Sequence, residues 1–156
     1  GARHKELDSK PVADLDLTRE RMEFFSSLYE RKAGAPWQEG NWGLQQILTD
    51  YAGAGPERVR SETLLAAGLK NLAELRELCR AEMKAANSHE LMRAAEVFDL
   101  MDVGEAILHC ARERRETRGL HIRKDYPFTN PLYNKKLFYI ERRGGEYVVG
   151  MRDKYV

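Results

Sequence analysis

No apolar stretch in these 156 residues reaches the roughly 18 residues that a membrane-spanning helix needs. The start, GARHKELDSKP, is polar and shows no secretory signal. Cysteine is scarce: Cys79 and Cys110 are the only two, and both lie in helical patterns without a CxxC spacing. We therefore expect a cytoplasmic protein that does not span a membrane and whose two thiols are buried inside helices.

The sequence also lacks the motifs of nucleotide-binding and nucleophilic enzymes. No G-x-G-x-x-G fingerprint is present, and no strand–helix–strand pattern would support one. No serine or cysteine lies in a recognisable catalytic turn. From these patterns we expect no activity, no bound cofactor and no metal site in this chain alone.

Charge is abundant and unevenly distributed along the chain, although the net charge is only +1. Residues 1–111 contain 14 Lys/Arg and 19 Asp/Glu, whereas residues 112–156 contain 12 Lys/Arg and 6 Asp/Glu. Such an asymmetry is typical of a protein that meets an oriented partner or a neighbouring acidic surface. It does not indicate a general affinity for nucleic acid.

Apolar residues recur at three- and four-residue steps over residues 16–34, 36–56 and 56–86, which predicts three helices. Pro56 suits the first turn of the third helix, where its missing N–H would be unpaired in any case. Glycines at the ends of the first two segments favour helix termination there.

A fourth helix is predicted to begin at Asn87, whose side chain caps it while Glu90 returns a hydrogen bond. The third and fourth helices are each about 30 residues long, and the short turn between them makes them antiparallel. Gly104 within the fourth helix indicates a close approach of another helix. We predict a mostly α fold: an antiparallel three-helix bundle with an extra N-terminal helix and a C-terminal β-hairpin tail.

Residues 128–156 change to the pattern of a hairpin. KLFYIERR and EYVVGMRD flank Gly144 and Gly145, which supply the positive φ angles of a tight turn. Because an isolated hairpin is marginally stable, this one must pack against another surface. The chain thus divides into a polar segment and helix (1–35), a helical bundle (36–127) and an extended tail (128–156).

The stretch ERRETRGLHIRKDYP, residues 113–127, concentrates five Lys/Arg, three carboxylates and a histidine. His121 and Asp125 could form an acid–base pair, because imidazole titrates near neutrality and a carboxylate orients it. Gly119 argues against the regular helix that this pairing needs. The candidates for a metal site are His109, Cys110 and His121. Their spacing is weak evidence, since adjacent helical positions point about 100° apart.

A nucleic-acid surface is a further possibility, because six cations and two aromatic residues lie between residues 112 and 128. The interleaved carboxylates Glu113, Glu116 and Asp125 instead favour a network of ion pairs and hydrogen bonds that shapes a turn. In this interpretation Gly119 is the left-handed cap of the fourth helix, and Pro127 prevents the helix from resuming. An exposed turn would not need so many hydrogen-bonding groups, whereas a turn buried against another domain would.

RRETRGLHIRKDYP resembles the R-x-E-[ST]-R-G-x-H-x-R-x-D-x-P motif near the end of succinate dehydrogenase and fumarate reductase flavoprotein subunits. Similar segments occur in their relatives L-aspartate oxidase and adenylylsulfate reductase. The matched positions are Arg114, Glu116, Thr117, Arg118, Gly119, His121, Arg123, Asp125 and Pro127. The order of helices is also similar, so the resemblance covers roughly residues 37–127. The tail differs from the usual ending of the family.

The resemblance implies the C-terminal helical domain of an FAD-dependent oxidoreductase, a bundle of spectrin-repeat-like shape that packs against the FAD-binding domain of the same parent protein. FAD would belong to the parent, which could also meet an iron–sulfur electron-transfer subunit and associate with a membrane through other subunits. The expected interdomain interface residues are Arg114, Glu116, Arg118, His121, Arg123 and Asp125. The alternative is a stand-alone helical protein-interaction module that docks through its hairpin or basic face.

Overall fold

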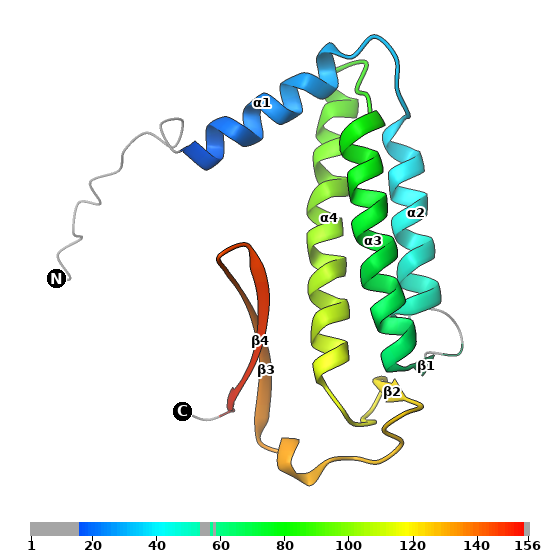
Figure 1. Cartoon of the computed structure of the whole chain (residues 1–156), viewed down its shortest axis with the longest axis vertical. Helices are drawn as coiled ribbons and strands as arrows, with labels where there is room; N and C mark the ends of the chain where they lie inside the picture. Colours follow the sequence, from blue (N-terminus) through cyan, green and yellow to red (C-terminus); the bar gives the residue numbers. More distant parts are fainter. Residues whose placement is uncertain (1–15, 54–56, 58, 155–156) are drawn as a thin grey trace, which may run out of the picture.

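The computed structural model describes residues 16–53, 57 and 59–154 (Figure 1). Within these residues four helices pack together: α1 (Asp16–Glu30), α2 (Trp37–Tyr51), α3 (Glu62–Glu82) and α4 (Ser88–Glu113). Two small sheets complete the fold: the parallel pair β1 (Val59–Arg60) and β2 (Ile122–Arg123), and the antiparallel pair β3 (Lys136–Arg143) and β4 (Glu146–Asp153). A short 3-10 turn, η2 (Pro131–Tyr133), precedes β3. The prediction of a mostly helical fold with a C-terminal hairpin is confirmed.

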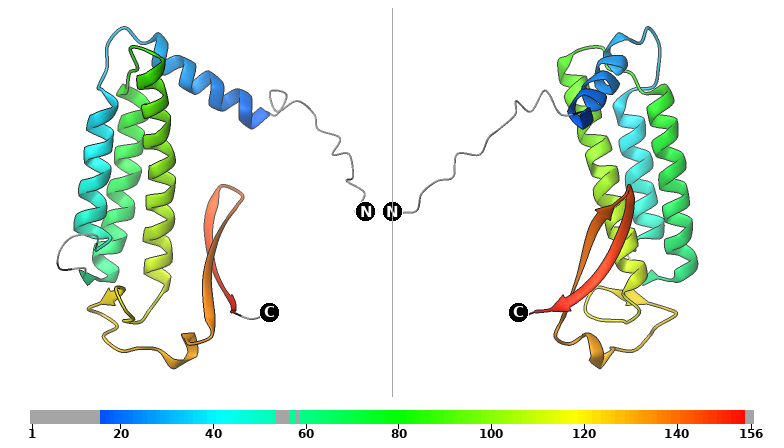
Figure 2. Two further views of the ribbon diagram at one scale, coloured as in Figure 1. Left: turned by 180° about the vertical axis from the view of Figure 1, so that it is seen from behind. Right: turned by 60° about the vertical axis from the view of Figure 1, so that its left-hand side comes forward.

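Helices α2, α3 and α4 lie side by side with alternating directions, and α1 leaves their upper end at an angle and packs on α4 (Figure 1). The hairpin lies along the lower part of α4, as the views from behind and from the side also show (Figure 2). No helix in the described part of the chain combines the length and the apolar character needed to cross a membrane.

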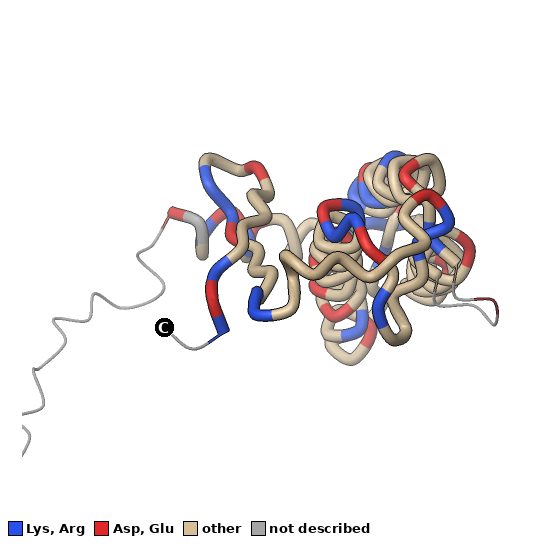
Figure 3. Tube along the Cα trace, turned by 90° about the horizontal axis from the view of Figure 1, so that it is seen from below, with Lys and Arg blue, Asp and Glu red and all other residues tan. Residues whose placement is uncertain are grey.

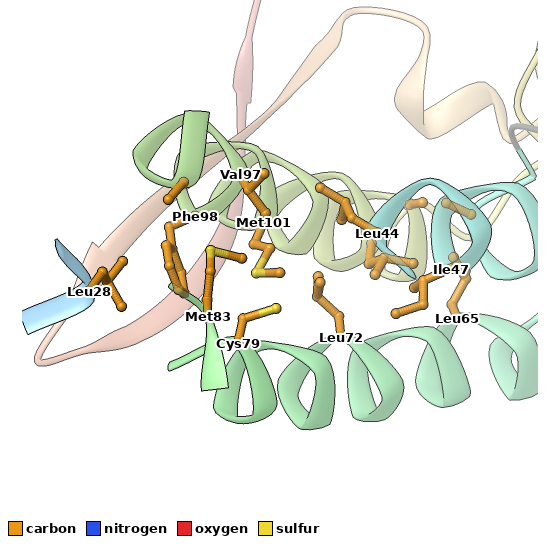
Figure 4. Close-up of a cluster of buried hydrophobic side chains, with 14 residues drawn as sticks. Leu28, Leu44, Ile47, Leu65, Leu72, Cys79, Met83, Val97, Phe98 and Met101 are labelled. Carbon is orange, nitrogen blue, oxygen red and sulfur yellow. The ribbon is translucent and has the colours of Figure 1, made fainter. Parts of the chain in front are cut away.

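The hydrophobic core lies between α2, α3 and α4 and extends to the end of α1 (Figure 4). Its central side chains are almost fully buried: Leu28, Leu44, Leu65, Leu72, Met83, Val97, Met101 and Leu108. Cys79 is also buried, whereas Cys110 is half-buried. Burial raises the pKa of both thiols, so they stay protonated at neutral pH.

The third helix begins later than its sequence pattern indicates. It starts at Glu62, with Ser61 as the cap whose hydroxyl accepts a hydrogen bond from the Leu64 amide at 3.2 Å. The residues before it form strand β1, which pairs with β2 of the distant turn. The predicted start over residues 56–61 was therefore wrong, although Pro56 itself lies outside the described residues. At the other end Met83 is already extended, so α3 has 21 residues.

The start of α4 is confirmed, but its predicted end was wrong. The Asn87 side chain accepts a hydrogen bond from the Glu90 amide at 3.0 Å, and the Glu90 carboxylate accepts one from the Ala86 amide at 2.8 Å. The helix has 26 residues and ends at Glu113. Gly119 has the expected positive φ of 57°, yet it lies beyond the helix in a separate turn. The first helix is also shorter than predicted, since α1 ends at Glu30.

The hairpin forms as predicted, with Gly144 and Gly145 at φ angles of 58° and 91°. It packs on α4 through aromatic contacts, because the Tyr147 ring lies 5.5 Å from the ring of His109. The guanidinium of Arg114 also lies 5.4 Å from the ring centre of Phe138. The division of the chain at residues 35/36 and 127/128 stays a prediction.

Two helical glycines provide a test of the helix packing. A methyl group on Gly68 would lie 2.7 Å from Tyr51 Cβ, whereas on Gly104 its nearest neighbour is the side-chain methyl Cδ1 of Leu44 at 3.3 Å. We expect Gly68→Ala to destabilise the protein by about 1–2 kcal/mol, because overpacking against a Cβ outweighs the gain in helix propensity. Gly104→Ala should be close to neutral. Urea unfolding measures both, and equal effects would contradict this account of the packing.

Candidate functional site: the ion-paired turn

Residues 114–130, which we call the ion-paired turn, cross the lower end of the bundle after α4. Thr117 organises their backbone: its amide donates to the Phe128 carbonyl at 2.9 Å, and its hydroxyl accepts from the Arg123 amide at 2.9 Å. The same hydroxyl lies 2.9 Å from the Tyr126 carbonyl, to which it can donate. The two ends of the turn are thereby held together within this chain.

Glu116 is the buried anion of the turn, with no exposed surface. Its Oε1 accepts hydrogen bonds from Arg114 Nε at 2.9 Å and Arg118 Nε at 3.0 Å, and its Oε2 accepts one from the Asn130 amide at 2.9 Å. Burial alone would raise the pKa of this carboxyl, but the hydrogen bonds and the adjacent guanidinium charge outweigh burial and lower it. The group is therefore ionised at neutral pH.

Arg118 continues this network outward. Its Nη2 donates to the Asn130 carbonyl at 3.1 Å and to Asn134 Oδ1 at 2.7 Å, so the turn is connected to the segment that carries η2. About one third of the Arg114 and Arg118 side chains remains exposed.

Arg123 is the second charged residue with no exposed surface, and it forms a two-point ion pair with Asp125 at 2.8 and 2.7 Å. Its Nη1 also donates to the carbonyls of Ala111 and Arg112, in the last turn of α4, at 2.8 and 2.9 Å. Asp125 in turn accepts the amide of Glu62, the first residue of α3, at 2.8 Å. The pair thus joins the end of one helix to the start of another.

These contacts shift the pKa values of both partners in the direction that keeps them charged. The hydrogen bond from Arg123 lowers the pKa of Asp125 to about 2, against the opposing effect of partial burial. The hydrogen bond to Asp125 likewise raises the pKa of the Arg123 guanidinium. The guanidinium also lies over the Tyr126 ring at 5.0 Å.

His121 does not pair with Asp125, whose oxygens are occupied by Arg123 and Glu62. Its Nε2 lies 2.9 Å from the Arg114 carbonyl, which can only accept, so Nε2 carries the proton. Burial is the main cause that lowers the pKa of His121, and the nearby positive charges of Arg60 and Arg114 contribute to it. The acid–base pair considered from the sequence is therefore not assembled here.

Two participants in this network were not identified from the sequence. Arg60 of β1 donates to the carbonyls of Ala52 at 2.7 Å and Leu120 at 3.1 Å, so it connects the end of α2 to the turn. Glu62 pairs with Arg112 at 2.6 Å. An acidic residue just after a serine cap is a recognisable helix-start signal, but its partner at Arg112 lies 50 positions away.

The six predicted interface residues fall into two groups on either side of His121. Arg114 and Arg118 surround Glu116, and Arg123 pairs with Asp125. The predicted network of ion pairs is present, and its polar atoms are engaged in holding the turn. Among the residues that the structure describes, no three His, Cys, Asp or Glu side chains are grouped to hold a metal ion. The role of the six residues at an interface stays a prediction.

The fold and the turn define a helical domain in which ion pairs hold a turn between two helix ends. Residues 43–150 match the family described as fumarate reductase flavoprotein C-term. This match covers more than half of the chain, and the chain belongs to that family. The match extends through β3 into β4, so the expectation that the tail departs from the family was wrong.

Individual relatives agree with this assignment. The chain is 34% identical over 88 residues to an L-aspartate oxidase of Yersinia pestis, a match that covers 56% of this chain and 15% of that protein. Adenylylsulfate reductase of Archaeoglobus fulgidus is 26% identical, with a TM-score of 0.74 over 91% of this chain and 25% of that one.

Two solved structures with lower identity share the fold. A chain of the Mycobacterium smegmatis Sdh1 complex has a TM-score of 0.77 at 22% identity and covers 97% of this chain and 26% of its own length. The FrdA chain of Escherichia coli quinol fumarate reductase has a TM-score of 0.74 at 20% identity, over 95% of this chain and 26% of its own. The chain therefore spans about a quarter or less of the length of these relatives.

Substitution of Glu116 tests whether its ion pairs stabilise the fold. In Glu116→Gln the new NH2 group would face a guanidinium or an amide donor, and two guanidinium groups would lose their carboxylate. We expect a loss of about 2–3 kcal/mol in the free energy of unfolding. Glu113→Gln is the matched control, because Glu113 is exposed and has no ion pair among the described residues. Similar stabilities of the two variants in urea would refute the role of Glu116.

The lowered pKa of Asp125 predicts a pH dependence. An unfolded Asp titrates near pH 4, whereas the folded group titrates at about 2. The contribution of Asp125 to the free energy of unfolding is therefore complete above about pH 5. It is lost as the pH falls toward 2, because the unfolded state binds the proton first. Asp125→Asn should be less stable at pH 7 and lose less stability between pH 5 and 2.5. Parallel pH profiles of wild type and variant would show that Asp125 makes no such contribution.

Proposed function

We propose that this chain is a non-catalytic C-terminal helical domain that packs against the FAD-binding domain of a succinate dehydrogenase/fumarate reductase-like oxidoreductase. The observation that carries the proposal is the family match over residues 43–150, which includes the whole ion-paired turn and most of the bundle. The comparisons also support a larger parent, since the chain covers 26% of the length of the Sdh1 complex chain and of the FrdA chain. Within the domain, α2, α3 and α4 would be the spectrin-repeat-like unit and α1 an addition to it.

The contacts of the turn support a structural role for this domain. Glu116 and Arg123 are fully buried, and their hydrogen bonds end on helix termini and on the turn itself. We assign to these two residues the task of holding the shape of the interface. The partly exposed members of the predicted interface, Arg114, Arg118 and His121, would lie at its surface.

The basic character of residues 112–156 supports a second contact. Their excess of Lys/Arg would favour an acidic neighbour, and the predicted neighbour is an iron–sulfur electron-transfer subunit. In this arrangement FAD is bound by the parent protein, and this chain supplies the packing surface.

Titration with FAD tests the division of labour. We expect micromolar FAD to leave the melting temperature of this chain unchanged, and we expect the fluorescence of the flavin to stay unquenched. The reason is that the described residues contain no dinucleotide-binding sheet. The same titration of an intact flavoprotein relative stripped of FAD is the positive control. Saturable binding of FAD by this chain at micromolar concentration would overturn the proposal.

A further inference from the structure

The hairpin is a sheet of two strands, so each strand has one edge that pairs with no other strand in the described part of the chain. β3 and β4 pair residue by residue along all eight of their positions. No backbone hydrogen bond joins β4 to an element other than β3 within residues 16–53, 57 and 59–154. Figure 3 shows the hairpin beside the helix ends, with the C-terminal end of β4 on the side of β3 away from the bundle. The outer edge of β4 is therefore a place where a further strand can be added.

The turn of the hairpin determines which residues of β4 present their backbone to this edge. In a hairpin closed by a two-residue turn, the residues that flank the turn exchange hydrogen bonds, and so does every second pair beyond them. Residues 144 and 145 form such a turn. By this rule Tyr147, Val149 and Met151 direct their N–H and C=O groups to the outer edge. An added strand would bond to these three residues.

Two charges on β4 have no partner in the described part of the chain. Glu146 and Arg152 are exposed, and neither of them forms an ion pair with a described residue. They lie on the same face of the sheet, because an even number of positions separates them. Six residues of extended strand place them roughly 20 Å apart, so they cannot pair with one another. The ion pairs within the hairpin use other residues: Lys136 with Asp153, and Arg143 with Glu141.

We infer that two copies of this chain associate through the outer edges of β4, antiparallel about a two-fold axis at Val149, and form one four-stranded sheet. In this register Glu146 of each copy lies opposite Arg152 of the other, so both unpaired charges gain a partner twice over. It is also a register in which the outward-directed backbone groups of the two strands meet. The contact is isologous, so association stops at the dimer. The inference goes beyond the proposed function and does not depend on it.

Other pairings fit the charges less well. The corresponding arrangement of two β3 edges would place Lys136 of each copy opposite Arg142 of the other, and cations along an edge protect it against pairing. A strand from a different protein would need a cation and a carboxylate at the same separation as Glu146 and Arg152. A second copy of the chain supplies both at that separation.

Sedimentation equilibrium of the full chain tests the inference. We expect a reversible monomer–dimer equilibrium at concentrations up to about 500 micromolar, since the pairing of two strand edges buries a small interface. Glu146→Arg and Arg152→Glu should each weaken dimerisation about tenfold, because each variant places like charges opposite one another at two positions. An equimolar mixture of the two variants should form a heterodimer with a dissociation constant within about threefold of the wild-type value, because every reversed charge then meets its opposite.

The matched controls are Lys70→Glu and Glu74→Arg, which change the net charge by the same amounts at an exposed ion pair of α3. They should dimerise within about twofold of the wild type, and melting curves establish that all four variants are folded. A wild-type chain that stays monomeric over this range would overturn the inference. Dimerisation of Glu146→Arg and Arg152→Glu at the wild-type strength, or no recovery in their mixture, would overturn it as well.

Amide hydrogen exchange tests the register. The amides of Tyr147, Val149 and Met151 should exchange more slowly as the concentration of the chain rises, because they enter hydrogen bonds only in the dimer. The amides of Val148 and Gly150, which the turn directs toward β3, should exchange at an unchanged rate. Concentration-dependent protection confined to the helices would place the contact elsewhere and overturn the inference.

Discussion

The arrangement of the lower end depends on the ion pair between Arg123 and Asp125, which lie two positions apart in the ion-paired turn. Arg123 places its guanidinium on the last carbonyls of α4, and Asp125 places its carboxylate on the first amide of α3. Each charge meets the helix end of opposite partial charge, so the pair satisfies polar groups that both helices would otherwise leave unpaired. The pair lies beside the β1–β2 pairing, in which Arg123 is the register partner of Arg60.

Much of the fold could be predicted because its determinants are local. The Asn87 cap, the alternation around Gly144 and the helical spacing of the apolar residues each depend on neighbours a few positions away. The start of α3 could not be predicted in the same way. Val59 and Arg60 have helix-compatible spacing, but they pair with Ile122 and Arg123, which lie 63 positions further along the chain, and tertiary pairing overrides local pattern.

The ion-paired turn could also be predicted only in part. Interleaved charges in residues 113–127 indicated a network, and the family resemblance indicated where it belongs. The sequence did not show which charges are buried: Glu116 and Arg123 differ from their exposed neighbours only through contacts with Asn130 and the end of α4. The role of Arg60 could not be predicted either. Its side chain donates to backbone carbonyls, and such partners cannot be recognised from the residue types in the sequence. The positive φ of Gly119 was predicted correctly, but the residue lies in a separate turn and does not cap α4.

The two ends of the bundle are closed by different kinds of interaction. At the upper end, Ala35 exchanges backbone hydrogen bonds with Glu82 and Lys84, and the Ala85 amide donates to Leu28. Side chains add to these bonds, since Arg31 donates to the Met83 and Arg80 carbonyls and the Glu90 carboxylate accepts the Ala86 amide. The lower end differs in that its closing charges, Glu116 and Arg123, have no exposed surface. Salt screens buried ion pairs much less than exposed ones, so the lower end should keep its electrostatic closure at ionic strengths that weaken the exposed ion pairs on the surface of the bundle.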